Sequence, residues 1–164
     1  MENIETRFVS IDGSTQKTAL SLFIDGNYST HILLDYSNDK NADTRFELMV
    51  KGVWRVLNEY KPNIIYIEET YMARNPKTTK ILTRLQGVVY AWCINNDCEF
   101  NVILPSQWRK QLSISQSKKK REELKEQSIQ YVLDKYQISV TDDEADAICI
   151  GDAVIKMFKA DKEK

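Results

Sequence analysis

The chain has 164 residues, a length typical of a single domain, and we predict one domain over residues 1–164. Its 42% hydrophobic and 29% charged residues are an ordinary globular balance, which excludes a largely disordered protein, and the net charge of −1 by itself indicates no polyanionic partner. The longest apolar run, 87–94, is far shorter than a membrane-spanning helix, so we expect no membrane association.

Three strands are predicted at the start of the chain. Residues 8–12 form a short apolar run, and residues 18–24 form a second one rich in Ala, Leu and Phe. The Asp-Gly-Asn turn at 25–27 leads into a third strand over 28–34, because Gly and Asn tolerate the backbone angles of tight hairpins. These three strands are expected to pair as an antiparallel meander.

Helices and strands then alternate. Apolar residues recur every three or four positions over 46–60, which predicts an amphipathic helix with Asp43 at its N-cap or in its first turn. The β-branched run 64–67 is typical of a strand buried on both faces. A second helix is predicted over 76–95, and a fifth strand over 100–104 that Pro105 closes.

The last third of the sequence predicts two more helices, over 119–136 and 142–160, after a Ser- and Gln-rich loop at 111–118. The elements together predict an α/β fold. Its sheet is five-stranded and mixed, with three antiparallel strands and two strands added in parallel through right-handed crossovers, and it is flanked by α-helices.

Basic residues are concentrated in the middle of the chain. Residues 71–121 carry ten basic and two acidic side chains, a net charge of +8, and the remainder carries −9. A phosphate-binding face gives this asymmetry, but so do solvated helix faces, and charge counting alone does not separate the two.

Four acidic residues stand where apolar elements end or begin. Asp12 terminates the first strand, and Glu68 follows the fourth strand with Glu69 beside it. Asp143 and Asp146 lie one helical turn apart at the start of the last helix. If that helix packs across the ends of the first and fourth strands, the four carboxylates converge.

Converging carboxylates repel one another, and divalent cations relieve that repulsion. Carboxylate oxygens suit Mg²⁺ or Mn²⁺ rather than zinc. Two such ions about 4 Å apart can hold a phosphodiester in line, one preparing the attacking water and the other stabilising the leaving 3′ oxygen. The pattern therefore predicts a nuclease with two metal ions and no covalent intermediate.

Each acid taken alone has a simpler explanation. Asp12 with Gly13 makes a good turn, a solvated strand end explains Glu68 or Glu69, and Asp143 favours a helix amino terminus through the macrodipole. Asp146 fits such explanations less well, because it lies between two alanines beside an apolar stripe. The combination is more specific than any single acid.

These residues resemble the RuvC family of Holliday junction resolvases, within the RNase H-like superfamily. Four stretches match in order and spacing and together span about residues 6–158: 10–12 with Ser14 and Thr18, 67–75, 85–88 and 143–147. The resemblance implies an RNase H-like fold and an endonuclease that nicks four-way DNA junctions in recombination and repair. It also implies a homodimer with the second helix at the interface, which would repeat the active site symmetrically.

The resemblance carries over to individual residues. It implies metal ligands at Asp12, Glu68, Asp143 and Asp146. The choice of Glu68 over Glu69 rests on the family register and on strand alternation, and the sequence alone leaves Glu69 as the alternative. It places an aromatic residue that stacks on junction bases at Tyr71. The expected DNA contacts are completed by seven basic residues: Arg74, Lys77, Arg109, Lys110, Lys118, Lys119 and Lys120.

Some positions depart from the family pattern. Gly13 follows Asp12 directly where the family usually has a proline between them, and Ala19 replaces a common glycine. The single histidine, His31, falls in a predicted strand and is interpreted as structural. These changes suggest a divergent branch, such as a phage-encoded resolvase, which could also cut flaps or forks.

Two other functions compete with this interpretation. The run 12–15 is similar to phosphate-binding turns of the actin and sugar-kinase superfamily, but that fold needs two such domains. A non-catalytic DNA-binding module would keep the basic middle and have no use for four convergent acids.

The sequence also suggests where the protein acts. Cys93, Cys98 and Cys149 form neither a metal-binding pair nor an even disulfide framework, and they are interpreted as free thiols of a reducing compartment. The amino terminus shows no signal peptide. We therefore expect the cytoplasm of a bacterial or phage-infected cell.

Overall fold

The computed structural model describes residues 5–70, 75–114 and 120–162. The elements in chain order are β1 (Arg7–Gly13), β2 (Lys17–Ile24), β3 (Asn27–Asp35), α1 (Ala42–Tyr60), β4 (Ile64–Glu68), α2 (Pro76–Asn95), β5 (Glu99–Ile103), α3 (Pro105–Gln111), α4 (Arg121–Tyr136) and α5 (Asp142–Lys162). The strands form one sheet in the order β3-β2-β1-β4-β5. β2 pairs antiparallel with β1 and β3, and β4 pairs parallel with β1 and β5, which confirms the predicted mixed sheet.

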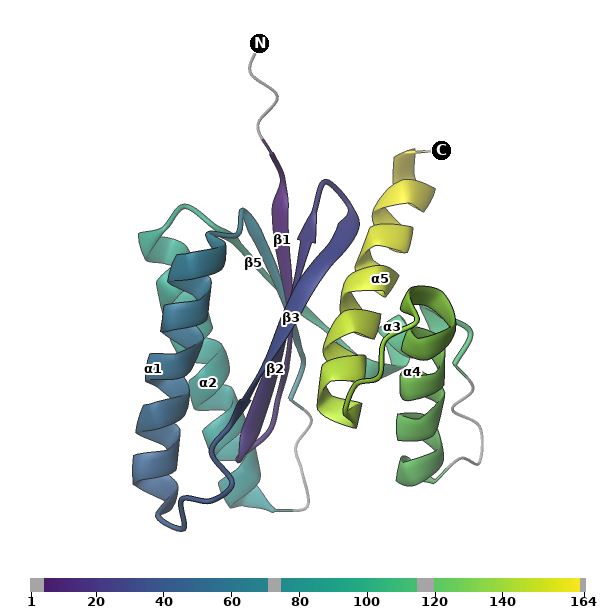
Figure 1. Ribbon diagram of the computed structural model, residues 1–164. Helices are drawn as coiled ribbons and strands as arrows, with labels where there is room; N and C mark the ends of the chain where they lie inside the picture. The colour runs from purple at the N-terminus through teal and green to yellow at the C-terminus, as the bar shows by residue number, and fades with distance from the viewer. Residues whose placement is uncertain (1–4, 71–74, 115–119, 163–164) are drawn as a thin grey trace.

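Helices cover both faces of the sheet (Figure 1). α1 and α2 lie on one face, and α5 crosses the other, where it contacts β1, β2 and β3. α3 and α4 pack against α5. Successive strand residues point to opposite faces, so β1 contributes Val9 and Ile11 to the core under α1 and α2, while Phe8 belongs to the core under α5.

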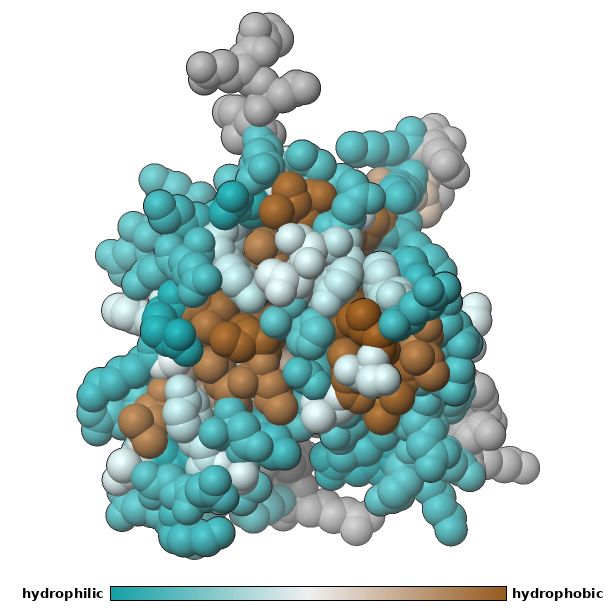
Figure 2. Space-filling model, in the orientation of Figure 1, coloured by the Kyte–Doolittle hydropathy of each residue, from teal (hydrophilic) through white to brown (hydrophobic). Residues whose placement is uncertain are grey.

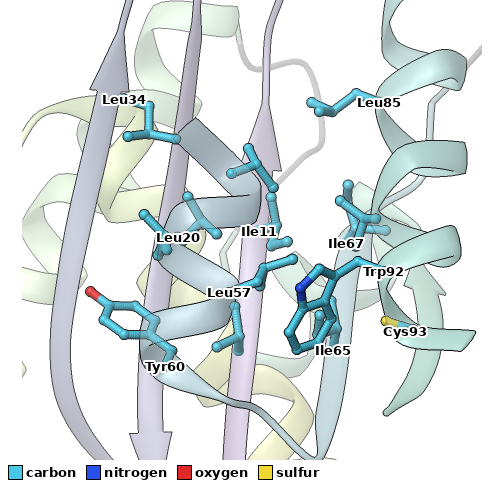
Figure 3. Packing of buried hydrophobic residues seen from close by; sticks show 14 of the residues in the cluster. Ile11, Leu20, Leu34, Leu57, Tyr60, Ile65, Ile67, Leu85, Trp92 and Cys93 are labelled. Carbon is cyan, nitrogen blue, oxygen red and sulfur yellow. The ribbon is translucent and has the colours of Figure 1, made fainter. Parts of the chain in front are cut away.

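The core under α1 and α2 is shown in Figure 3, where Ile11, Ile65 and Ile67 of the sheet pack toward Leu57 and Trp92 of the helices. Burying each large aliphatic side chain contributes about 1.5–3 kcal/mol, so this layer supplies a large share of the folding free energy. The parallel strands β1 and β4 are thereby held side by side, and their carboxyl ends lie at the same edge of the sheet.

Helix α5 lies close to the sheet because residue 151 is glycine. A Cβ at Gly151 would lie 2.8 Å from Ser10 Oγ and would clash with the ring of Phe23. The absence of a side chain therefore lets the backbone of α5 rest on β1 and β2, which brings the first turns of α5 near the carboxyl end of β1.

The helix boundaries confirm part of the predictions and correct others. Asn41 caps α1, accepting hydrogen bonds from the main-chain N–H of Asp43 (3.0 Å) and of Thr44 (2.9 Å), so Asp43 is a first-turn acid. Pro105 does not simply close β5. It begins α3, a helix that the sequence analysis missed, because a proline without an N–H fits the first turn of a helix as well as the end of a strand.

On the face shown in Figure 2, hydrophobic residues reach the surface in patches that hydrophilic residues border. Among the helices of the described residues, none has the length and apolar character that a membrane span requires. The three cysteines are all free thiols, as expected.

Candidate active site

The four predicted acids border one cavity. Its volume is about 560 Å³, and its walls include Asp12, Glu68, Asp143 and Asp146. The cavity lies where the carboxyl ends of β1 and β4 meet the amino ends of α4 and α5, at the lower end of the view in Figure 1. Residues more than 130 positions apart in the sequence are thus brought to one place.

Strand alternation decides which glutamate faces the cavity. Ile64 and Tyr66 of β4 pack in the core under α5, and Glu68 continues that face into the cavity. Glu69 points the other way, where its Oε1 accepts hydrogen bonds from the main-chain N–H of Thr70 (2.9 Å) and from Gln86 Nε2 (3.2 Å). Gln86 Nε2 also contacts the main-chain oxygen of Glu68 (3.1 Å), so α2 holds the end of β4.

The start of α5 carries two further acids, and both have other partners. Asp142 forms an ion pair with Lys125. Glu144 accepts hydrogen bonds from the N–H (2.7 Å) and hydroxyl (2.8 Å) of Thr141, which caps the helix, and lies 3.4 Å from His31 Nε2. Asp143 and Asp146 are the other acids of this turn that border the cavity, and a hydrogen bond with the side chain of Ser128 counteracts the raised pKa of Asp146.

Burial and mutual repulsion raise the pKa values of these carboxyl groups. Burial, followed by the charges of Glu68, Asp146 and Asp143, raises the pKa of Asp12 well above its usual value. Burial raises the pKa of Glu68 to about 7 and that of Asp146 to about 6. The pKa of Asp143 is raised by burial and by the charge of Asp142. Charged carboxylates are therefore costly in this cavity unless a positive charge compensates them.

The residues of this cavity fit a divalent cation. Asp146 Oδ1 is buried and has no hydrogen-bond partner within the described residues, although a buried carboxylate oxygen ordinarily has one. All four acids offer oxygen ligands, the type that Mg²⁺ and Mn²⁺ prefer. In the described part of the chain, no group of three or more Asp, Glu, His or Cys side chains is already arranged to hold a metal ion.

Basic side chains line the same cavity. Arg109 was among the predicted DNA contacts, and its charge counteracts the raised pKa values of Asp12 and Glu68. Arg121 and Lys125 of α4 also line the cavity, and the sequence analysis did not select them. Their spacing of four residues, which places both on one helix face next to the acidic start of α5, is the signal that could have found them.

The other predicted DNA contacts lie elsewhere. Lys77 borders a second cavity, of about 580 Å³, formed by α1 and α2. Lys110 and Lys120 are exposed, on α3 and at the amino end of α4. Four predicted contacts lie outside the described residues: Tyr71, Arg74, Lys118 and Lys119.

His31 lies in β3, as predicted, and its Nδ1 is 2.6 Å from the hydroxyl of Tyr28. Trp108, which no sequence pattern singled out, is buried beside the cavity, and its indole Nε1–H donates a 2.7 Å hydrogen bond to Glu68 Oε2. It belongs to α3, the helix that the sequence analysis missed.

Comparisons with known proteins relate this chain, including every residue that lines the cavity, to one family. The family model described as "Crossover junction endodeoxyribonuclease RuvC" matches residues 9–154. Relatives with that description include the protein of Fusobacterium nucleatum, 26% identical over 149 residues (88% of this chain and 77% of the relative). Another is the protein of Natranaerobius thermophilus, 28% identical over 120 residues (73% of each chain).

Solved structures share the fold. T. thermophilus RuvC in complex with Holliday junction substrate matches with a TM-score of 0.72 and 15% identity, covering 94% of this chain and 96% of that chain. The yeast mitochondrial Holliday junction resolvase Ydc2 matches with a TM-score of 0.60 and 14% identity, covering 96% and 81%. At these identities the matches show the fold, and they confirm the expected RNase H-like architecture.

Proposed function

The chain belongs to the RuvC family of crossover junction endodeoxyribonucleases, and on that basis we propose that it nicks four-way (Holliday) junctions by metal-dependent phosphodiester hydrolysis. The observation that carries the proposal is the single cavity bordered by Asp12, Glu68, Asp143 and Asp146, all of which lie within the family match. A non-catalytic DNA-binding module would keep the basic residues but would gain nothing from burying four acids together.

The four carboxylates would hold Mg²⁺ or Mn²⁺, two ions in each active site. When bound, the ions supply an activated water and stabilise the leaving 3′ oxygen. Asp146 Oδ1 is buried without a hydrogen-bond partner among the described residues, and burial raises the pKa values of Glu68 and Asp146. Both observations support this role, because a bound cation would stabilise the charged carboxylates. Arg109, Arg121 and Lys125 would bind phosphates at the rim and orient the scissile strand.

We also propose that two copies pair through the outer face of α2. Gly87, Tyr90 and Ile94 follow one another at helical spacing on that face; Tyr90 is 52% exposed and Ile94 65%. A Cβ at Gly87 would meet nothing within 4 Å in its own chain, so this position leaves room for a close approach by a partner helix. An isologous dimer would present two active sites to the two strands that a junction resolvase cuts.

The bacterial relatives support action in the cytoplasm of a bacterial or phage-infected cell. The matched structure that holds a Holliday junction supports branched DNA as the substrate, and flaps and forks are the competing substrates.

The test is cleavage of a synthetic four-way junction, with a flap, a fork and a linear duplex of the same sequence as comparisons. We expect nicking in Mg²⁺ or Mn²⁺, with the four-way junction cut fastest. Asp146→Asn should lose cleavage yet bind the junction as the native chain does, since the change preserves shape and removes one charge. Cleavage in excess EDTA, or full activity of Asp146→Asn, would contradict the proposed mechanism.

A further inference from the structure

Trp108 occupies a position between the hydrophobic core and the acidic cavity. Its side chain is fully buried, in the cluster that also contains Val132 and Ile148. Its helix, α3, follows β5 directly and packs against α5. The ring thus lies in the core under α5 and reaches Glu68 at the end of β4.

The polar edge of the ring faces the acid. Trp108 Nε1–H donates to Glu68 Oε2 at 2.7 Å, a short distance for a hydrogen bond from an indole N–H. A buried indole N–H needs an acceptor, and a buried carboxylate needs donors, so each group satisfies the other. One N–H occupies one acceptor position of Oε2 and leaves the remaining lone pairs of the carboxylate for a cation.

The face of the same ring carries a cation. The guanidinium carbon of Arg109 lies 4.7 Å from the centroid of the Trp108 ring, within the range of a cation–π contact. Arg109 borders the cavity and counteracts the raised pKa values of its acids. One buried side chain, Trp108, therefore contacts both the carboxylate of Glu68 and the guanidinium of Arg109.

We propose that Trp108 is a positioning residue that orients Glu68 for the metal ion. The proposal rests on the metal-dependent function proposed above and adds a residue that acts through Glu68. Leucine and phenylalanine would also place an apolar side chain under α5, but both are smaller than tryptophan and neither offers an N–H to the carboxylate. Partners of this kind, which orient a ligand without touching the ion, typically change metal affinity 10- to 100-fold when they are replaced.

The chain offers a matched control. Trp92 of α2 is also buried, at 4% exposure, and its Nε1–H also donates to a side chain, Asn58 Oδ1, at 2.8 Å. It packs in the core on the opposite face of the sheet. Trp92→Phe and Trp108→Phe therefore remove the same atoms and the same kind of hydrogen bond, and only the second change affects the cavity.

The experiment measures binding of Mn²⁺ alone to the DNA-free protein, from the electron paramagnetic resonance signal of free Mn²⁺. Trp108→Phe should raise the Kd for Mn²⁺ 10- to 100-fold, and Trp92→Phe should leave it within about twofold of the native value. In junction cleavage, Trp108→Phe should shift the Mn²⁺ midpoint upward by the same factor and recover most of the rate at saturating Mn²⁺. In a double variant with Glu68→Gln, Trp108→Phe should weaken Mn²⁺ binding little beyond the effect of Glu68→Gln alone.

The outcomes separate the two proposals. If the native chain neither binds Mn²⁺ nor nicks a junction, the proposed function fails. If the native chain binds Mn²⁺ and Trp108→Phe binds it equally well, or if Trp92→Phe weakens it as much, only the positioning role fails.

A second measurement keeps the test independent of the folding of Trp108→Phe. In a chain with Trp54→Phe and Trp92→Phe, all indole fluorescence comes from Trp108, because the sequence has three tryptophans. Titration with Mg²⁺ should change that emission, with a midpoint equal to that of Mg²⁺ binding. An emission that stays constant when Mg²⁺ is added would overturn the positioning role.

Discussion

Ser10 and Ala147, which are 137 positions apart in the sequence, are joined by a 2.7 Å hydrogen bond from Ser10 Oγ to the main-chain oxygen of Ala147. The hydroxyl of Ser21 lies 2.7 Å from that of Ser10 and completes a buried polar pair. Ser10 precedes Asp12 by two residues of β1, and Ala147 follows Asp146 directly. This contact therefore fixes the distance between the strand and the helix that together supply three of the four acids.

Gly151→Ala should separate those two elements. Its methyl group would overlap the ring of Phe23 and approach Ser10 Oγ, neither of which can move freely in a packed core. We expect a loss of roughly 1–3 kcal/mol in the free energy of unfolding, measured by urea denaturation, together with slower junction cleavage. Phe23→Leu makes room for the methyl group, so the double variant should lose less than the sum of the two single changes. Strictly additive losses would contradict the packing explanation.

Asp146→Asn should stabilise the metal-free protein above pH 6. Burial raises the pKa of Asp146 from 3.8 to about 6, so between about pH 4 and 6 the folded state keeps a proton that the unfolded state has lost. The contribution of Asp146 to the free energy of unfolding is therefore fully present below pH 4 and is lost as the pH rises through 6. In EDTA at pH 7.5 the variant should gain roughly 1–3 kcal/mol in the free energy of unfolding.

The gain from Asp146→Asn should shrink as the pH is lowered toward 4, where the native carboxyl group is already neutral. Thermal or urea unfolding at several pH values provides the measurement. A gain of the same size at pH 4 and pH 7.5 would mean that the charge of Asp146 is not its source.

Metal affinity should rise with pH and level off just above 7. Burial raises the pKa of Glu68 to about 7, and a protonated carboxyl group is not a ligand, so protons compete with the ion below that pH. Calorimetric titration with Mn²⁺ should show up to about tenfold weaker binding for each pH unit below 7. Glu68→Gln should bind more weakly and depend less on pH between 6 and 8. An equally steep dependence in Glu68→Gln would assign the proton to another group.

Junction binding should depend on salt through the basic rim of the cavity. Each phosphate contact contributes about −0.9 to the slope of log K against log salt concentration. Arg121→Gln should therefore make the slope shallower by about one unit and weaken binding to any branched DNA. Lys61→Gln is the matched control, because Lys61 is exposed and precedes β4, at the end of the sheet opposite the cavity. Equal slopes for both variants would exclude Arg121 as a phosphate contact.

Gly87→Arg should break the proposed dimer without unfolding the chain. The position is open in the isolated chain, and arginine favours a helix interior over glycine by up to about 1 kcal/mol. Sedimentation should show a dimer for the native protein and a monomer for this variant, while Ser139→Arg, at an exposed residue between α4 and α5, should stay dimeric. A native monomer, or a dimeric Gly87→Arg, would reject the interface on α2.

The sequence by itself determined the succession of strands and helices, because hydrophobic periodicity is a local property that each segment shows on its own. It also placed Asp12, Glu68, Asp143 and Asp146 at the ends of those segments, and it showed that the middle of the chain is basic. Helix α3 escaped detection because it has only seven residues and begins at a proline that equally suits the end of a strand.

Only the tertiary structure decided how these segments meet. Strand alternation predicts that Glu68 and Glu69 face opposite sides of the sheet, but it does not say which side each one faces. The parallel register of β1 with β4, which pairs Ile11 with Ile67, places Glu68 on the side of α5. The close approach of α5 at Gly151 and the hydrogen bond from Trp108 to Glu68 join segments that are distant in sequence. Such contacts depend on complementary shape and on partners for buried polar groups, and no local pattern of residues records them.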